Sequence, residues 1–141
     1  MNFYEFHFSQ YLQSINQFNL HKYNEKIYDI FHKYPQNMIL YGPPGIGKYS
    51  QAIKFISLFS QSNLKYEKKM SINYEKNEFI FRLSDVHIDI DLNNLGCNSK
   101  LVWNEFFTNV LNFISINKTH FFIICKNFHT IHNELHDVFY S

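Results

Sequence analysis

Apolar and polar positions along the chain follow two different periods, and the first clear period is helical. Residues 23–34 place apolar side chains three or four positions apart, and the run stops before Pro35, which cannot continue a helix. The stripe would consist of Ile27, Ile30 and Phe31. The pattern therefore predicts an amphipathic helix that buries these three side chains.

A short apolar run at residues 38–41 follows this helix and has the composition of a buried strand. Helical spacing returns over residues 50–59. The segment between them is rich in glycine and proline, so the predicted local order is strand, loop and helix.

The middle of the chain alternates with a period of two, which is typical of strands. Residues 65–74 and 77–83 flank the polar pair Glu75 and Lys76, and this arrangement predicts a β-hairpin. Residues 86–92 alternate strictly and predict a half-buried strand. The polar face of that strand would carry His87, Asp89 and Asp91.

The last third of the chain predicts two helices and one buried strand. A helix begins near Ser99, a good N-cap. Its buried stripe would consist of Val102, Phe106, Val110, Phe113 and Ile114. The continuous apolar run at residues 121–125 is typical of a central parallel strand that is buried on both faces. The stripe of the final helix would consist of Ile131, Leu135, Val138 and Phe139.

The bulk composition fits one soluble intracellular domain. The chain has 141 residues, a net charge of +1 and 18% charged residues, so no global basic field indicates DNA or an anionic membrane as a direct partner. Cys97 and Cys125 are too few and too isolated for a disulfide framework or a zinc site. Three histidines, which we interpret as a solvated face, are His129, His132 and His136. We expect the cytoplasm or the nucleus, no secretion, no membrane partner and no metal site.

The loop between the first strand and its helix carries the chemistry of phosphate binding. Its three glycines can adopt positive φ, so that backbone N–H groups converge on phosphate oxygens. Lys48 supplies a charge for the outer phosphates at the start of a helix, which favours the same anion. The predicted nucleotide-binding residues are Gly42, Pro43, Pro44, Gly45, Ile46, Gly47, Lys48, Tyr49 and Ser50. The structural alternative is a plain turn between two elements.

Two departures indicate that a nucleotide bound there is not hydrolysed. In a phosphate-binding loop that hydrolyses its nucleotide, the residue after the lysine carries a hydroxyl that coordinates Mg²⁺, but here that residue is Tyr49. Ser50 lies about 100° further around the helix, so its hydroxyl is a poor substitute. In the same class of proteins, a buried strand ends in an acidic pair that holds the metal and activates water. Here the strand at residues 121–125 is followed by Lys126 and Asn127. We therefore expect no catalytic residues, and ATP or ADP binding without Mg²⁺. The alternative for Lys126 and Asn127 is the end of an ordinary core strand.

Together these motifs resemble one protein family. The sequence Gly-Pro-Pro-Gly-Ile-Gly-Lys, the hairpin, the strand at 86–92 and the segment Gly96-Cys97-Asn98-Ser99 are similar to the AAA+ module of clamp-loader small subunits. The chain is most similar to the replication factor C subunit that corresponds to bacterial delta prime, which does not hydrolyse ATP. The segment at 95–100, with Trp103, resembles forms encoded by giant DNA viruses.

The resemblance implies an α/β fold of the P-loop NTPase (AAA+) type, a three-layer sandwich with a parallel sheet and an inserted β-hairpin. It divides the chain into an N-terminal helical segment, residues 1–34, and a partial nucleotide-binding domain, residues 35–141. Family members continue into a fourth strand, an arginine finger and a helical lid, so we expect the domain to be incomplete at its C-terminus. The implied partners are other clamp-loader subunits, the sliding clamp and, through the assembled complex, primer–template DNA.

Three hypotheses for function follow. The first is a non-hydrolysing, structural clamp-loader subunit in DNA replication. The second is an active P-loop ATPase or kinase, which the single arginine, Arg82, disfavours because phosphoryl transfer needs several cationic groups. The third is a truncated fragment without function. Under the first hypothesis, contact with the sliding clamp would use residues 65–83 and 99–117. Trp103 and Phe107 would be exposed anchors of this contact. The alternative for these two aromatic residues is packing in the core.

Overall fold

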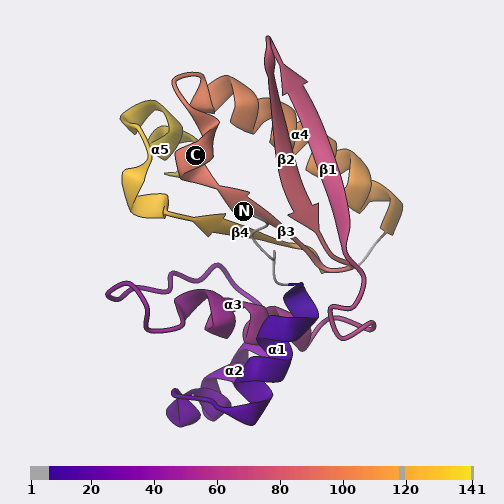
Figure 1. The fold of residues 1–141 in the computed structure, drawn as a ribbon, viewed down its shortest axis with the longest axis vertical. Helices are drawn as coiled ribbons and strands as arrows, with labels where there is room; N and C mark the ends of the chain where they lie inside the picture. Colours follow the sequence, from indigo (N-terminus) through magenta and orange to yellow (C-terminus); the bar gives the residue numbers. More distant parts are fainter. Residues whose placement is uncertain (1–6, 118–119, 141) are drawn as a thin grey trace, which may run out of the picture. The chain divides into compact units, whose positions relative to one another are not determined.

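The structure of the chain, a computed structural model, describes residues 7–117 and 120–140. It has an α/β fold, which confirms the predicted class at this coarse level. The described residues form two compact units (Figure 1). Unit 1 contains the residues up to Glu67 together with Ser84–Val86, and unit 2 contains Lys68–Leu83 and the residues from His87 onward. The domain boundary that the resemblance implies, after residue 34, falls within unit 1.

Unit 1 is helical in its described residues. Its elements are α1 (Phe8–Gln17), the 3₁₀ turn η1 (Lys22–Asn24), α2 (Glu25–Lys33) and α3 (Lys48–Ser57). Both α1 and α2 contact α3, and the core of the unit lies along these contacts. The core includes Phe8, Ile15, Tyr28, Phe31, Ile53, Phe55, Ile56 and Leu64. The predicted helices after residues 23 and 50 therefore both form, with ends that differ from the predictions by about two residues.

The buried face of α2 differs from the predicted stripe. Phe31 is buried as expected, but Ile27 and Ile30 are 47% and 59% exposed, and Tyr28 is buried in their place. The rings of Tyr28 and Phe31 meet the ring of Phe55 edge to face, with centroids 4.6 Å and 5.3 Å away. Two apolar stripes run along this helix, and the aromatic one is buried because its rings bury more area and form specific ring pairs.

The predicted strand at residues 38–41 does not form. These residues belong to no helix or strand in the structure, and the side chains of Ile39 and Tyr41 are 82% and 96% exposed. A strand is stable only when its backbone donors and acceptors pair with a neighbouring strand. All four strands of the described chain belong to unit 2, so unit 1 offers residues 38–41 no pairing partner of its own.

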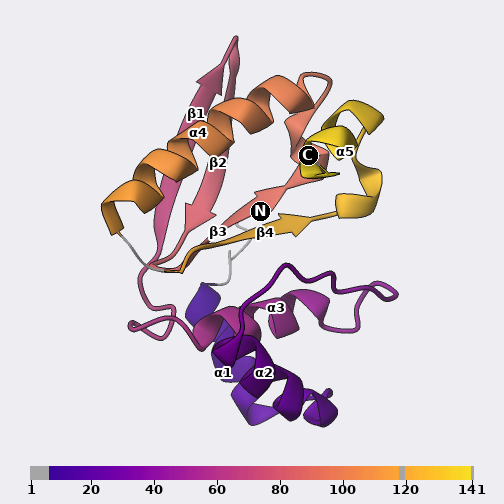
Figure 2. The ribbon, with the colours of Figure 1, turned by 180° about the vertical axis from the view of Figure 1, so that it is seen from behind.

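Unit 2 contains a four-stranded sheet in the order β1-β2-β3-β4 (Figure 2). The strands are β1 (Lys68–Tyr74), β2 (Asn77–Leu83), β3 (His87–Asp91) and β4 (Phe122–Lys126). The first two confirm the predicted hairpin, with Tyr74 paired to Asn77 around the two-residue turn. The sheet is mixed rather than parallel, because β2 is antiparallel to β3 and only β3 and β4 run parallel. The connection from β2 to β3 is only Ser84–Val86, which is too short for a parallel crossover.

The environments of β3 and β4 also differ from the predictions. The residues His87–Ile90 of β3 are buried on both faces, including the face predicted to be solvated. The residues of β4 are half-buried, because β4 lies at the edge of this four-stranded sheet rather than at its centre. Hydrophobic periodicity reports the character of the two faces of a strand, and it does not report how many neighbours the strand has.

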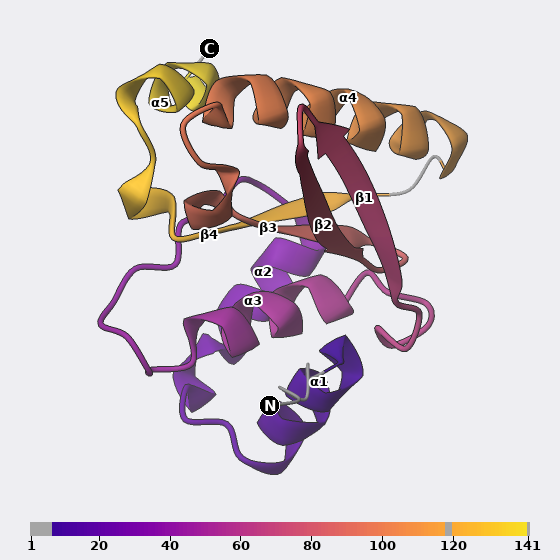
Figure 3. The ribbon, with the colours of Figure 1, turned by 45° about the horizontal axis from the view of Figure 1, so that its top comes forward.

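Two helices complete unit 2. Helix α4 (Ser99–Asn117) begins where it was predicted and lies across one face of the sheet, with α5 (Asn133–Tyr140) beside its first turns (Figure 3). The short 3₁₀ turns η2 (Leu92–Leu95) and η3 (Phe128–Thr130) follow β3 and β4. Val102, Phe106 and Val110 are buried as predicted. The final stripe is confirmed by the buried Leu135 and by Ile131, Val138 and Phe139, which pack against the same core.

Trp103 belongs to this core and is not an exposed anchor. It is 5% exposed, and its ring lies 4.7 Å from the ring of Phe139 and 5.3 Å from the ring of Phe106. Phe107 is 41% exposed, as expected for a side chain off the buried stripe. The stripe of α4 is therefore wider than predicted, because α5 covers a flank of the helix that sequence spacing alone leaves to solvent. Among the helices described, none is both long and apolar enough to span a bilayer.

Candidate functional site

The three glycines of the loop before α3 all adopt positive φ, as the sequence predicts. Gly42, Gly45 and Gly47 have φ values of +155°, +80° and +82°. Gly47 is the N-cap of α3 and adopts the left-handed conformation, which L side chains rarely enter. At Gly42 a Cβ atom would lie 2.4 Å from Cδ1 of Ile46, so the Ile46 side chain would have to shift, and the φ of +155° would strain any other residue. The loop therefore depends on glycine at these two positions.

Lys48 is the first residue of α3, and its side chain folds back over the loop. The ammonium group donates hydrogen bonds to the carbonyl oxygens of Gly42, at 2.7 Å, and Pro43, at 2.6 Å. An ammonium group has three donors, so one remains for an incoming anion while these two bonds persist. Its charge lies at the N-terminal end of α3, where the helix dipole also favours an anion.

His21 also holds the loop. Its Nε2 atom donates a hydrogen bond to the carbonyl oxygen of Ile46 at 2.7 Å, which ties the loop to the residues before α2. The contact joins residues that are 25 positions apart. No spacing or motif signals such a contact, so sequence reasoning missed His21. Pro44 is exposed at the tip of the loop, as Pro43 is.

Tyr49 stands where a metal-binding hydroxyl is expected, and its ring packs instead against α1. The Tyr49 and Tyr11 rings meet edge to face with centroids 4.9 Å apart. Ser50 is half-buried on α3, and the next side chain, Gln51, is buried. Gln51 accepts a hydrogen bond from the Tyr28 hydroxyl, whose pKa is raised by burial. The start of α3 thus places an aromatic ring and a buried amide network where a metal-binding hydroxyl would otherwise stand.

Lys126 is the last residue of β4 in unit 2, and it forms an ion pair. Its Nζ atom lies 3.2 Å from Oδ2 of Asp89, and Oδ1 of the same carboxylate lies 3.4 Å from Nε2 of His87. Asp89 and His87 are almost fully buried, so the cation compensates a carboxylate that would be costly to bury alone. Strict alternation had placed His87 and Asp89 on one face, but it could not indicate that this face is buried.

Asn127 follows β4 and ties the ends of the two parallel strands together. It adopts a positive φ of 56°, and its Nδ2 atom donates to Oδ1 of Asp91 at 2.8 Å. The same oxygen accepts a hydrogen bond from the backbone N–H of Asn93 at 3.1 Å. The two predicted residues therefore lie together in unit 2, each paired with an aspartate of β3, and both contacts are explained by the local fold.

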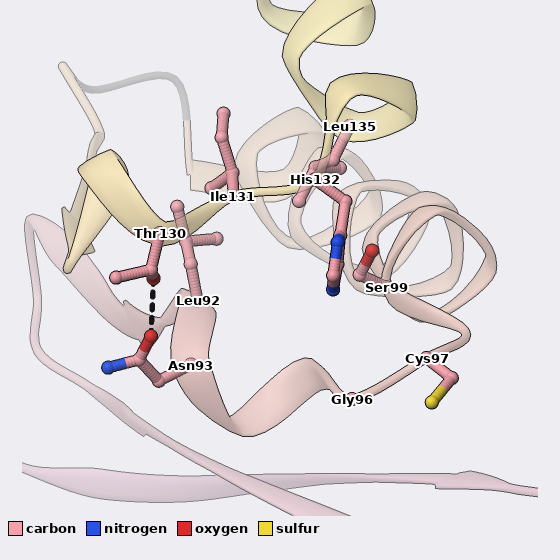
Figure 4. Close-up of a pocket in the computed structure, with 9 residues that line it drawn as sticks. All are labelled: Leu92, Asn93, Gly96, Cys97, Ser99, Thr130, Ile131, His132 and Leu135. Carbon is pink, nitrogen blue, oxygen red and sulfur yellow. Dashed lines mark hydrogen bonds between the residues drawn. The ribbon is translucent and has the colours of Figure 1, made fainter.

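A cavity of about 260 Å³ lies in unit 2, at the segment that joins η2 to α4 (Figure 4). Its polar lining residues are Asn93, Cys97, Ser99, Thr130 and His132. Leu92, Ile131 and Leu135 form an apolar wall. The distinctive segment Gly96-Cys97-Asn98-Ser99 was the only sequence signal for it, and that signal pointed to a family rather than to a cavity.

The two cysteines differ in environment. Burial raises the pKa of the Cys125 thiol to about 12, so this thiol stays protonated near neutral pH. Cys97 is exposed. All three predicted solvated histidines, His129, His132 and His136, are exposed as well, although only His136 lies on α5 itself.

The loop residues 42–50 thus lie in unit 1, while Lys126, Asn127 and the cavity lie in unit 2. A comparison with protein-family models finds no family that matches the chain, and a comparison with curated proteins finds no significant relative.

Proposed function

We propose that residues 42–50 bind the phosphates of ATP or ADP without hydrolysing them, in a protein of the P-loop NTPase (AAA+) type. The observation that carries this proposal is the loop itself. Its glycines have positive φ, one of them caps α3, and the ammonium group of Lys48 lies over the loop at the start of that helix. Backbone donors, a helix N-terminus and a lysine are the combination that holds phosphate groups in such loops.

The positions that would carry the hydrolytic groups argue against ATP hydrolysis by this chain. Hydrolysis needs a metal ligand after the lysine and an acidic group that orients water. The ring of Tyr49 is used in packing against Tyr11, and Lys126 and Asn127 are paired with Asp89 and Asp91. An active ATPase or kinase is therefore the weaker alternative. The chain has a single arginine, Arg82, whereas phosphoryl transfer needs several cationic groups.

The biological role that fits a silent nucleotide-binding subunit is structural. By its sequence resemblance we propose that the chain acts in DNA replication as a clamp-loader subunit of the replication factor C type. Its partners would be the other loader subunits, the sliding clamp and, through the complex, primer–template DNA, inside the cell. Trp103 has no part in clamp contact in this proposal, since it is buried, whereas Phe107 remains exposed on α4.

Calorimetric titration of the whole chain with ADP and with ATP, with and without Mg²⁺, tests nucleotide binding. We expect weak binding that Mg²⁺ does not enhance, and Lys48→Ala should weaken it by roughly tenfold or more, because bonds to a charged group are lost. Lys54→Ala is the matched control, since Lys54 lies on the same helix and bonds to Asn16 on α1. Equal affinities for wild type and Lys48→Ala would show that the loop is not the binding site.

The same preparations test turnover. Phosphate release from ATP should not exceed the rate without protein, for wild type and for both lysine variants. A Mg²⁺-dependent release that Lys48→Ala abolishes and Lys54→Ala preserves would establish an active ATPase and overturn the non-hydrolysing assignment.

A further inference from the structure

The cavity of unit 2 lies against the first turn of α4. Val102 N–H donates to the carbonyl oxygen of Asn98 at 3.0 Å, and this is the first bond of the helix. The N–H groups of Ser99, Lys100 and Leu101 come before it and have no partner within the helix. Helix α4 is 19 residues long, so its N-terminal end carries the full partial positive charge of a helix dipole.

The Ser99 hydroxyl is a second, separate donor at this place. Ser99 is 6% exposed, lines the cavity, and forms no hydrogen bond with the other lining residues (Figure 4). In the part of the chain that the structure describes, the Ser99 hydroxyl forms no hydrogen bond, and its oxygen is not fully enclosed by protein atoms. The hydroxyl is therefore available to donate a hydrogen bond to a ligand in the cavity.

The charge and shape of the lining decide which ligand would fit. None of the nine lining residues is acidic, and the His132 side chain adds a group that can donate to an anion. Leu92, Ile131 and Leu135 line the same space with apolar surface. Thr130 donates to the side-chain oxygen of Asn93, so the available polar groups of the lining are the Asn93 side-chain NH₂ group, Cys97, Ser99 and His132.

From this geometry we propose that the cavity at the start of α4 binds a phosphate monoester. The phosphate accepts hydrogen bonds from the Ser99 hydroxyl, the first amides of α4 and the His132 ring, and the ester group lies against the apolar wall. The cavity belongs to unit 2 and residues 42–48 belong to unit 1, so the two binding proposals can be tested one at a time.

Backbone amide shifts of the Lys48→Ala chain, in which the glycine loop is disabled, test the site with two probes. Phenyl phosphate should shift the amides of residues 99–101 in a saturable manner, and inorganic phosphate should do so more weakly because it lacks the apolar group. Ser99→Ala should weaken phenyl phosphate binding about tenfold, as expected for the loss of one bond to a charged group.

Ser115→Ala is the matched control, because Ser115 lies near the other end of α4 and is exposed. It should leave the affinity unchanged. His132→Gln is a second variant at an exposed position, so it tests the site even if Ser99→Ala fails to fold, and it should also weaken binding. No saturable shift at residues 99–101, or equal affinity in the Ser99→Ala, His132→Gln and Ser115→Ala chains, would overturn the proposal. Equal affinity for the two phosphates would overturn the assigned apolar wall.

Discussion

Two aromatic residues four positions apart on α4 show how strongly neighbours decide the role of a side chain. Trp103 is in contact with Phe106 and Phe139, while Phe107 stacks on Trp103 from the solvent side at 6.2 Å. Both were predicted as exposed anchors on the basis of helical spacing. The contact with α5 separates them, because Phe139 comes from a helix that begins more than 25 residues later in the chain.

Substitution of these two residues should therefore have unequal effects on stability. Trp103→Ala should lower the free energy of unfolding by about 3–5 kcal/mol, since it leaves a cavity among buried rings. Phe107→Ala should cost about 1 kcal/mol or less, because much of its ring already contacts water. Urea unfolding followed by circular dichroism measures both. Equal losses for the two variants would mean that Trp103 is not part of the core.

At the scale of elements, residues 38–41 are the point where pattern and structure diverge most. An apolar run of four residues before a glycine loop indicates a buried strand, yet Ile39 and Tyr41 are almost fully exposed. The glycine loop after the run keeps its expected backbone all the same. Its geometry is set by glycine and by contacts with His21 and Lys48, and it does not require a strand before it.

The double variant Ile39→Asn with Tyr41→Asn distinguishes the two arrangements. If both side chains are in solvent, the free energy of unfolding should change by less than about 1 kcal/mol, as for other surface positions. Ile53→Asn, on the buried face of α3, is the contrasting variant and should prevent stable folding, because it places an unpaired amide in the core. A loss of several kcal/mol for the double variant would show that residues 38–41 form the buried strand after all.

At the scale of the whole molecule, the chain builds two separate apolar cores. In unit 1 the rings of Phe55, Tyr28 and Phe31 lie together. In unit 2 the core is centred on α4 and the inner face of the sheet, where the ring of Phe106 lies 4.8 Å from the ring of Phe81. Each core contains its own buried aromatic residues, so each unit has its own source of stability.

Core substitutions should accordingly act within one unit. Phe55→Ala should reduce amide protection in α1, α2 and α3 by the equivalent of about 3–5 kcal/mol and spare the protection of β1–β4 and α4. Phe106→Ala should produce the reverse pattern. Native-state hydrogen exchange resolved by residue measures both. If either variant lowers protection equally throughout the chain, the two units unfold as one cooperative body.

What the sequence by itself determined is local. The hairpin around Glu75 and Lys76, the start of α4 at Ser99 and the positive φ of the loop glycines all depend on residues within a few positions of one another. Steric limits and turn chemistry act over such distances, so the amino-acid sequence is enough to predict these features, although the first helix bond goes to the carbonyl oxygen of Asn98 rather than of Ser99.

The tertiary structure alone decided which faces are buried and which groups meet. Helical spacing predicted that Ile27 and Ile30 of α2 would be buried, but the contact with the ring of Phe55 selects the face with Tyr28. Strand alternation placed His87 and Asp89 together, but only the tertiary structure shows that both are buried and that β4 brings Lys126 to Asp89. Burial depends on residues that are distant along the chain. The face that becomes buried is the one that gains the most free energy from apolar area and ion pairs formed with those residues.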